Sequence, residues 1–391
     1  MNIWSDYRKT PLPDLLSFVV DNRGKTVPTT EDGNHILIAT NCIRNENLYP
    51  SYEKVRFLSE ETYQNWFRAH PVPGDIIFVC KGTPGRTCMV PDPIDFCIAQ
   101  DMIALRANPA LIYNRFLLVV LRSREIQEQI TNTSVGDVIP HFKKQFLNQL
   151  LVPVPPMEVQ RKIGDLYFSL TLKEELNKKI NENLSDQIQA IYSNEFDPTT
   201  HTPSGVLAEI CSYSSDRIPV SELSVSTYFS TENMQPNKMG SVDATSLPSI
   251  PQTTGCHKGD VLISNIRPYF KKIVYVTDDR CGCSTDVLCF VPKEDRYSAF
   301  LFGTLYMDRF FDYMVAGSKG TKMPRGDKQQ IMNYPVVLPN EESLDLFNGL
   351  IVPMMDQIAA NRVESSRLAA LRDALLPKLM SGELDVSELE I

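Results

Sequence analysis

The sequence has no apolar run of the roughly 18 residues that a membrane-spanning helix needs. Its first nine residues also lack the apolar core of a secretory signal. The nine cysteines are an odd number and are unevenly spread, which is typical of free thiols rather than of a disulfide framework. We therefore expect a soluble, cytoplasmic protein without a membrane partner.

Motifs for cofactor chemistry are missing as well. No Gly-x-Gly-x-x-Gly segment follows an expected strand, and no Gly-x-x-x-x-Gly-Lys-Ser/Thr loop is present to hold phosphates. The Asn/Asp-Pro-Pro-Tyr/Phe segment that amino-methyltransferases carry is also absent. The sequence therefore predicts a chain that has no catalytic site and binds no cofactor of its own.

Metal ligands are present without the expected spacing. Cys256-His257 and Cys281-Gly282-Cys283 offer thiolate and imidazole groups, the usual ligands of zinc. Paired ligands of structural zinc sites are usually separated by about two to four residues, a spacing that these pairs do not have. Nothing similar occurs in the first half of the chain, so we expect no metal site.

The composition is that of an ordinary globular protein, with 42% hydrophobic, 9% aromatic and 22% charged residues. At about 100 to 200 residues per domain, 391 residues predict two or three domains. The net charge of −9 argues at first against a nucleic-acid partner. However, residues 1–150 carry 16 basic and 16 acidic side chains, and residues 198–339 carry 14 of each. The acidic excess is confined to 151–197 and 340–391, which hold 5 basic and 8 acidic, and 4 basic and 10 acidic, side chains.

An internal repeat relates the two halves of the chain at an offset of 184 to 185 residues. The matches keep their order and spacing, which predicts two copies of one unit, each a globular part followed by an acidic tail. Residues 74–77 match 259–262 and 100–103 match 285–288 at an offset of 185; Tyr113 and Phe116 match Tyr297 and Phe300, Gly136 and Pro140 match Gly320 and Pro324, and 154–156 match 338–340 at an offset of 184.

The globular parts are expected to have a mixed α/β (α+β) fold. Short apolar runs at 76–80 and 261–264, and the β-branched run at 272–276, predict strands. Helical spacing of apolar residues predicts a helix near the end of each part, within 115–130 and 299–315. Asp75 and Asp260 each follow a glycine before a strand, which favours a turn over a catalytic carboxylate.

The acidic tails predict two long amphipathic helices, at 157–193 and about 341–379, with apolar residues in steps of three and four. We expect them to pack as an antiparallel coiled-coil spacer, with Asn177 and Asn361 fixing the register. The alternative is that each helix packs only into the core of its own domain. The predicted residues of the helix or partner interface are Ile163, Leu170, Asn177, Ile180, Leu184, Ile191, Phe347, Ile351, Met354, Ile358, Asn361 and Leu368.

Four segments follow from this organisation. We expect a first globular domain at 1–153, a first spacer helix at 154–197, a second globular domain at 198–339, and a second spacer helix with a tail at 340–391. Two similar domains joined by stiff helices would hold two recognition surfaces at a fixed separation. On duplex DNA, such modules reach successive major grooves when their centres lie about 34 Å apart.

Residues 151–163 contain Pro155-Pro156 followed by Gln160-Arg161-Lys162. This segment is similar to the junction between a target-recognition domain and the first helix in the specificity subunits of type I restriction-modification systems, a family that the sequence resembles. Residues 259–272 and 320–326 are similar to segments of its second recognition domain, and 375–384 to its C-terminal end. The second copy departs at Pro339-Asn340, which lacks the second proline and the Gln-Arg-Lys run.

The resemblance implies a non-catalytic subunit that selects a bipartite, asymmetric site on double-stranded DNA. It also implies two modification subunits as partners, which bind S-adenosylmethionine and methylate adenine. Where the system cleaves DNA, an ATP-dependent restriction subunit is a further partner.

Candidate DNA-contacting residues are cations in loops beside glycine or proline, because loops reach into grooves and phosphates attract Arg and Lys. In the first domain they are Arg23, Lys25, Lys81, Arg86, Lys143 and Lys144; in the second they are Arg267, Lys271, Lys272, Lys319, Lys322, Arg325 and Lys328. The alternative for each is an ordinary solvated surface charge.

Two other functions remain open at this point. One is an adaptor that joins proteins through its helix pair and does not bind DNA. The other is a nuclease with a metal at Asp92 or Asp101, which is disfavoured because no Glu-x-Lys follows at a suitable distance.

Overall fold

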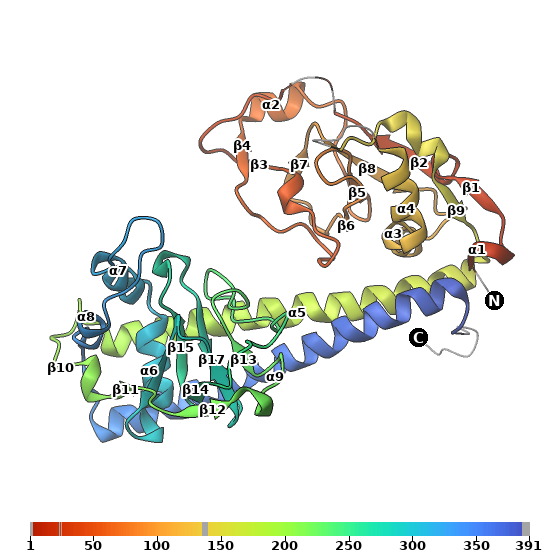
Figure 1. Cartoon of the computed structure of the whole chain (residues 1–391). Coiled ribbons are helices and arrows are strands. Elements are labelled where there is room, and N and C mark those ends of the chain that lie inside the picture. Colours follow the sequence, from red (N-terminus) through yellow and green to blue (C-terminus); the bar gives the residue numbers. More distant parts are fainter. Residues whose placement is uncertain (1–2, 23, 25, 135–139, 385–391) are drawn as a thin grey trace. The chain divides into compact units, whose positions relative to one another are not determined.

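The computed structural model describes residues 3–22, 24, 26–134 and 140–384. They divide into two compact units, one drawn from the described residues of 1–178 and 362–391, the other formed by residues 179–361. Each unit combines helices and strands (Figure 1), which confirms the mixed fold class. Gly136 of the predicted repeat lies outside the described residues.

The first unit contains a globular domain and the first part of a long helix. Its elements are α1 (Ile3–Asp6), β1 (Lys9–Pro11), β2 (Leu16–Val20), β3 (His35–Ile38), β4 (Arg56–Leu58), α2 (Glu60–Asn65), β5 (Ile76–Val79), β6 (Thr87–Met89), β7 (Phe96–Ile98), β8 (Met102–Ala107), α3 (Asn114–Arg122), α4 (Arg124–Thr133), the 3-10 helix η3 (Lys144–Gln149), β9 (Leu151–Pro153) and α5 (Met157–Phe196).

The second unit begins within α5. Its elements are β10 (Gly205–Val206), β11 (Cys211–Tyr213), β12 (Arg217–Pro219), β13 (Tyr228–Phe229), β14 (Gln252–Cys256), β15 (Val261–Ser264), the 3-10 helix η6 (Pro268–Phe270), β16 (Ile273–Tyr275), β17 (Cys281–Cys283), β18 (Val287–Pro292), α6 (Ser298–Tyr306), α7 (Asp308–Ala316), α8 (Lys328–Met332), β19 (Pro335–Val336) and α9 (Glu341–Ser381).

The main sheet has the same strand order in both units. Four antiparallel strands follow the order β2-β8-β5-β6 in the first and β11-β18-β15-β16 in the second. A second sheet contains one parallel pair in each unit, β3 with β7 and β13 with β17. A short antiparallel pair, β1 with β9 or β10 with β19, completes the pattern. The two units are therefore copies of one fold, as the sequence repeat predicts.

The change of offset within the repeat has a structural cause. β5 and β15, and β8 and β18, begin 185 residues apart, whereas α3 and α6, and α4 and α7, begin 184 apart. Six residues join β8 to α3, and five join β18 to α6. The one-residue difference therefore lies in this connection, between the main sheet and the helices.

Asp75 and Asp260 occupy equivalent turns. The Asp75 carboxylate accepts a hydrogen bond from the Val72 N–H at 3.0 Å, and the Asp260 carboxylate accepts one from the His257 N–H at 2.8 Å. The glycine before each aspartate has a positive φ, 86° and 96°, a conformation that glycine adopts without steric cost. The interpretation of both aspartates as turn residues is confirmed.

Within the first unit, α5 and α9 pack side by side. Arg372 donates to Glu174 at 3.0 Å, and Asn177 donates to Glu364 at 2.8 Å and to Ser365 at 3.3 Å. Residue numbers rise along α5 while those of their partners fall along α9. The two helices are therefore antiparallel in this unit.

The second unit contains the same kind of helix contact. Asn361 of α9 donates to Asn181 of α5 at 2.8 Å. Further along, the Phe347 ring lies against Tyr192 and Phe196 of α5, with centroids 6.2 Å and 5.4 Å apart. Asn177 and Asn361 are both buried, and each bonds to the opposite helix within its own unit. These bonds are those expected of polar residues that fix register.

Most of the predicted helix-interface residues are removed from solvent. Ile163, Asn177, Phe347, Ile351, Ile358 and Asn361 are buried, and Leu170, Leu184, Ile191, Met354 and Leu368 are half-buried. Ile163 belongs to the core of the first unit, and Phe347 and Ile351 to that of the second. The helices therefore contribute to the domain cores as well as to the helix pair.

Ile180 is the exception. Its side chain is 44% exposed and belongs to neither core, so its place in the helix or partner interface stays a prediction. An apolar stripe indicates which residues share a face, but it does not indicate how far along the helix that face is covered.

The predicted segment boundaries are only partly comparable with the structure. The long helices begin at Met157 and Glu341, and α9 stays helical across Pro353. The compact units divide both helices at mid-length, after Lys178 and before Arg362, so neither helix is a separate body. The limits of the two globular domains, 1–153 and 198–339, stay a prediction.

Phe347 anchors α9 in the second unit, where its ring also lies 6.2 Å from that of Phe300. We expect Phe347→Ala to destabilise this unit by about 3 to 5 kcal/mol, because a buried aromatic ring leaves a cavity. The control is Leu346→Ala, at a side chain that is 68% exposed, with an expected change within about 0.5 kcal/mol. Hydrogen exchange in peptides from α6 measures both; equal protection in the two variants would contradict the assignment.

Candidate nucleic-acid interface

Two loops meet in the first unit, and both were predicted to contact DNA. One loop, 81–86, joins β5 to β6, and the other contains 140–143, before η3. Gly82 N–H donates to the Pro140 carbonyl at 3.0 Å, and Phe142 N–H donates to the Cys80 carbonyl at 2.7 Å. These bonds bring together cationic segments that are about 60 residues apart in the sequence.

The second unit contains the same two backbone hydrogen bonds between its equivalent loops. Arg267 N–H donates to the Pro324 carbonyl at 2.8 Å, and Gly326 N–H donates to the Asn265 carbonyl at 3.3 Å. Each residue lies 184 or 185 positions after its counterpart in the first unit. Each unit thus presents one pair of loops in the same structural place, and we call it the loop pair.

The cations of the first loop pair are mostly exposed. Lys81 and Lys143 are exposed, and Arg86 is half-buried. Lys81 lies 4.0 Å from Asp101, and Lys144 lies 3.2 Å from Asp21. Arg23 and Lys25, also predicted to contact DNA, lie outside the described residues.

In the second loop pair, several cations form exposed ion pairs. Lys319 lies 2.6 Å from Asp327, and Arg325 lies 2.9 Å from Asp286. Surface pairs of this kind contribute about 0 to 1 kcal/mol, so a phosphate can replace the carboxylate at little cost. Lys322 is exposed and forms no ion pair within the described part of the chain.

The other predicted cations of this unit are more constrained. Lys271 pairs with Asp308 at 3.0 Å, and Lys328 lies over the Tyr213 ring at 5.7 Å from its centroid. Lys272 donates to the Thr231 carbonyl, and burial lowers the pKa of its ammonium group. Lys272 therefore supports the loop from within and is less available to a ligand than the exposed lysines are.

Comparison with known proteins connects this geometry with a family. Residues 18–186 match the family described as the type I restriction modification DNA specificity domain. The specificity subunit of the type I restriction enzyme MjaIX from Methanocaldococcus jannaschii is 38% identical over 76 residues, which are 19% of this chain and 18% of that protein. The specificity subunit of the type I restriction enzyme HindI from Haemophilus influenzae is 20% identical over 397 residues, covering 80% of this chain and 86% of that one. By sequence this chain therefore resembles HsdS, the specificity subunit of type I systems, and we call it HsdS-like for this similarity.

The fold agrees with this similarity. The crystal structure of the S subunit of a type I restriction-modification system from M. genitalium has a TM-score of 0.61 and 17% sequence identity with the HsdS-like chain. The comparison covers 96% of each chain, so the two proteins share a fold over nearly their whole length.

Lys238 is a cation of the HsdS-like chain that sequence reasoning missed. Its ammonium group lies 2.7 Å from Asp308, which also pairs with Lys271, and its side chain is only 9% exposed. Burial lowers the pKa of Lys238, whereas its hydrogen bond holds the pKa of Asp308 below the ordinary value. The sequence signal was the Asn237-Lys238-Met239-Gly240 run, whose first two residues have positive φ.

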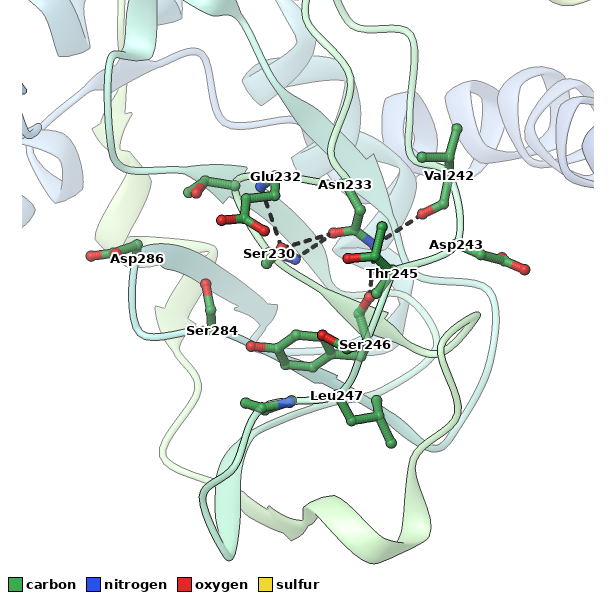
Figure 2. A pocket seen from close by; sticks show the side chains of 14 residues that line it. Ser230, Glu232, Asn233, Val242, Asp243, Thr245, Ser246, Leu247, Ser284 and Asp286 are labelled. Atoms are coloured by element: carbon green, nitrogen blue, oxygen red, sulfur yellow. Dashed lines mark hydrogen bonds between the residues drawn. The ribbon is translucent and has the colours of Figure 1, made fainter.

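A polar pocket beside the second loop pair was also missed. It has a volume of about 390 Å³ and is open to solvent. Figure 2 shows Ser284 and Asp286 on one side of it and the 242–247 segment on the other. Asn233 connects segments of the chain that line the pocket. Its side-chain NH2 group donates to the Tyr228 and Val242 carbonyls, and its side-chain oxygen accepts from the Ser230 N–H. Asp286, which pairs with Arg325, connects the pocket with the loop pair.

The other site predictions concern metals and membranes. Among the described residues, no cluster of three or more His, Cys, Asp or Glu side chains can hold a metal ion. His257 instead lies 2.9 Å from Asp216, and this hydrogen bond raises the pKa of the imidazole. Within the same residues, no helix is long and apolar enough to cross a membrane.

Proposed function

We propose that this HsdS-like chain selects the DNA sequence on which a type I restriction-modification complex acts, and that it performs no chemistry itself. The observation that carries the proposal is the repeated loop pair, which gives each unit a cationic surface at an equivalent position. Loops with Arg and Lys bind phosphates, and their polar side chains reach base edges. This combination suits recognition of double-stranded DNA.

The target is proposed to be bipartite and asymmetric. The two loop pairs share two backbone hydrogen bonds but have different side chains, with Lys81 and Arg86 in one and Arg267, Lys322 and Arg325 in the other. Two identical readers would favour a palindrome, whereas unequal readers favour two different half-sites. The helices α5 and α9 are proposed to act as the spacer that sets the gap between them.

The proposed partners are two modification subunits, which bind S-adenosylmethionine and methylate adenine, and a restriction subunit where the system cleaves DNA. Exposed apolar side chains on the long helices support a protein partner there. Val363, Leu371 and Leu176 are exposed in the first unit, and Leu346, Leu350 and Ile180 in the second. We place the complex in the cytoplasm.

The test is DNA binding by the purified chain, alone and with its modification subunit, on a random duplex pool at moderate salt. Because both globular parts are neutral overall, we expect weak binding by the chain alone and strong, sequence-specific binding when the partner adds cationic surface. An adaptor would protect no DNA, and equal affinity with and without the partner would contradict the proposal.

The exposed lysines of the second loop pair give a sharper test. We expect Lys319→Ala with Lys322→Ala to weaken binding about equally on all sequences, because these groups meet phosphates. The slope of log affinity against log salt should fall by about 0.9 for each lost phosphate contact. Arg280→Ala is the control, since Arg280 is exposed between β16 and β17, at the opposite end of β16 from the loop pair. An unchanged slope in the double variant would remove these lysines from the interface.

A further inference from the structure

The connection from β15 to β16 carries two exposed aromatic rings. Tyr269 is 49% exposed and Phe270 is 39% exposed, and their ring centroids lie 4.7 Å apart. They lie in η6, at the tip of the second loop pair. The equivalent loop of the first unit, 81–86, contains two glycines and no aromatic residue. Only the loop pair of the second unit therefore has aromatic rings in this loop.

The backbone of this tip is fixed from both sides. Arg267 and Lys271, which flank η6, both have φ of 51°, the left-handed region that non-glycine residues rarely adopt. Such residues persist only where the surroundings hold them. Here Asn237 N–H donates to the Phe270 carbonyl at 2.8 Å, Lys238 N–H donates to the Lys271 carbonyl at 2.9 Å, and the Arg267 N–H bond to the loop 318–327 holds the other end.

Cations surround the two rings. Arg267 and Lys271 flank them in sequence, and Lys238 joins Lys271 at the carboxylate of Asp308. Lys238 and Lys271 already have Asp308 as a partner, whereas Arg267 forms no ion pair within the described residues. A nucleic acid offers a phosphate to Arg267 and base faces to the rings, which an apolar protein surface does not. The chemistry of the tip thus matches duplex DNA better than it matches a protein surface.

We propose that Tyr269 and Phe270 form a wedge that stacks against bases at the half-site read by the second unit and partly opens one base step. This inference rests on the proposed function. Apolar side chains that enter between bases unstack the step and kink the duplex. Pyrimidine–purine steps open most easily, so the wedge makes the second reader sensitive to how easily the DNA deforms. The first reader has no such element in its described loop.

The experiment uses the complete complex of this chain with its modification subunit, on a duplex carrying its selected site. 2-Aminopurine replaces one base at a time in each half-site, because its fluorescence rises when stacking is lost. With the wild-type chain we expect a rise at one position of the second half-site and none in the first. The double variant Tyr269→Ala with Phe270→Ala should lose this rise and bind the site at least about 10-fold more weakly, as stacked rings do when truncated.

Two controls separate stacking from folding. Tyr269→Phe keeps a ring and should retain the fluorescence rise, and Ile250→Ala removes an exposed apolar side chain elsewhere in the same unit. Both should bind like the wild type. Wild-type fluorescence and affinity in the double alanine variant would overturn the wedge, as would loss of assembly with the modification subunit instead of loss of the DNA signal. Absence of DNA binding by the wild-type complex would overturn the proposed function itself.

Discussion

Replacing residues 1–150 with the equivalent segment of another such chain should change one half of the methylated site completely and leave the other half and the gap unaltered. The exchange transfers both loops of the first loop pair, 81–86 and 140–143, and leaves 265–272 and 318–328 in place. After the exchange, β1 comes from the donor chain and β9 from this chain. Their hydrogen bonds join backbone groups and do not depend on side-chain identity. The first unit should therefore fold after the exchange when the donor segment keeps the apolar residues that pack against Ile163 of α5.

Genome-wide mapping of methylated adenines checks this result in a host that carries the exchanged chain. The reciprocal exchange of 198–334 is the matched control and should change the other half only. If either exchange altered both halves of the methylated site, the two units would not recognise their half-sites independently.

Lengthening both long helices by seven residues should lengthen the gap of the recognised site by about three base pairs. The insertions go after Lys178 in α5 and before Arg362 in α9, where the chain passes from one unit to the other within a helix. Seven residues add about 10.5 Å and nearly two full turns, so the apolar face of each helix keeps its direction. At about 3.4 Å per base pair, this length equals three steps of DNA.

A five-residue insertion in both helices is the control, because it adds length but does not keep the apolar face of each helix in the same direction. It adds about 7.5 Å but turns each helix about 140° out of register, so methylation should be lost. Selecting preferred sites from a duplex library with variable gaps measures both variants. An unchanged gap after the seven-residue insertion would show that the helices do not set it.

The repeat and the long helices could be predicted from the sequence, because both depend on local residue patterns. The Gly-Asp turns before β5 and β15 and the three-four spacing in α5 and α9 require no knowledge of distant contacts. The order of the main sheet was not accessible in this way. β8 lies between β2 and β5, and that pairing depends on side chains far apart in the chain.

The candidate site was predictable in composition but not in assembly. The candidate cations could be found from the sequence, because they are lysines beside glycine in loops. The hydrogen bond from Gly82 to Pro140 could not, because it joins two segments that no local pattern connects. Tyr269 and Phe270 were missed because aromatic residues usually belong to cores. The exposure of Ile180 was not predictable either, because an apolar stripe does not show how far along a helix it is covered.

The division of the chain into two units has a practical optical consequence. Both tryptophans of the sequence, Trp4 and Trp66, precede residue 178 and belong to the first unit. Intrinsic indole emission therefore reports on the first reader alone. A Trp introduced into the second unit, in a chain without the native pair, gives the complementary signal, so occupancy of each half-site can be followed separately by fluorescence titration.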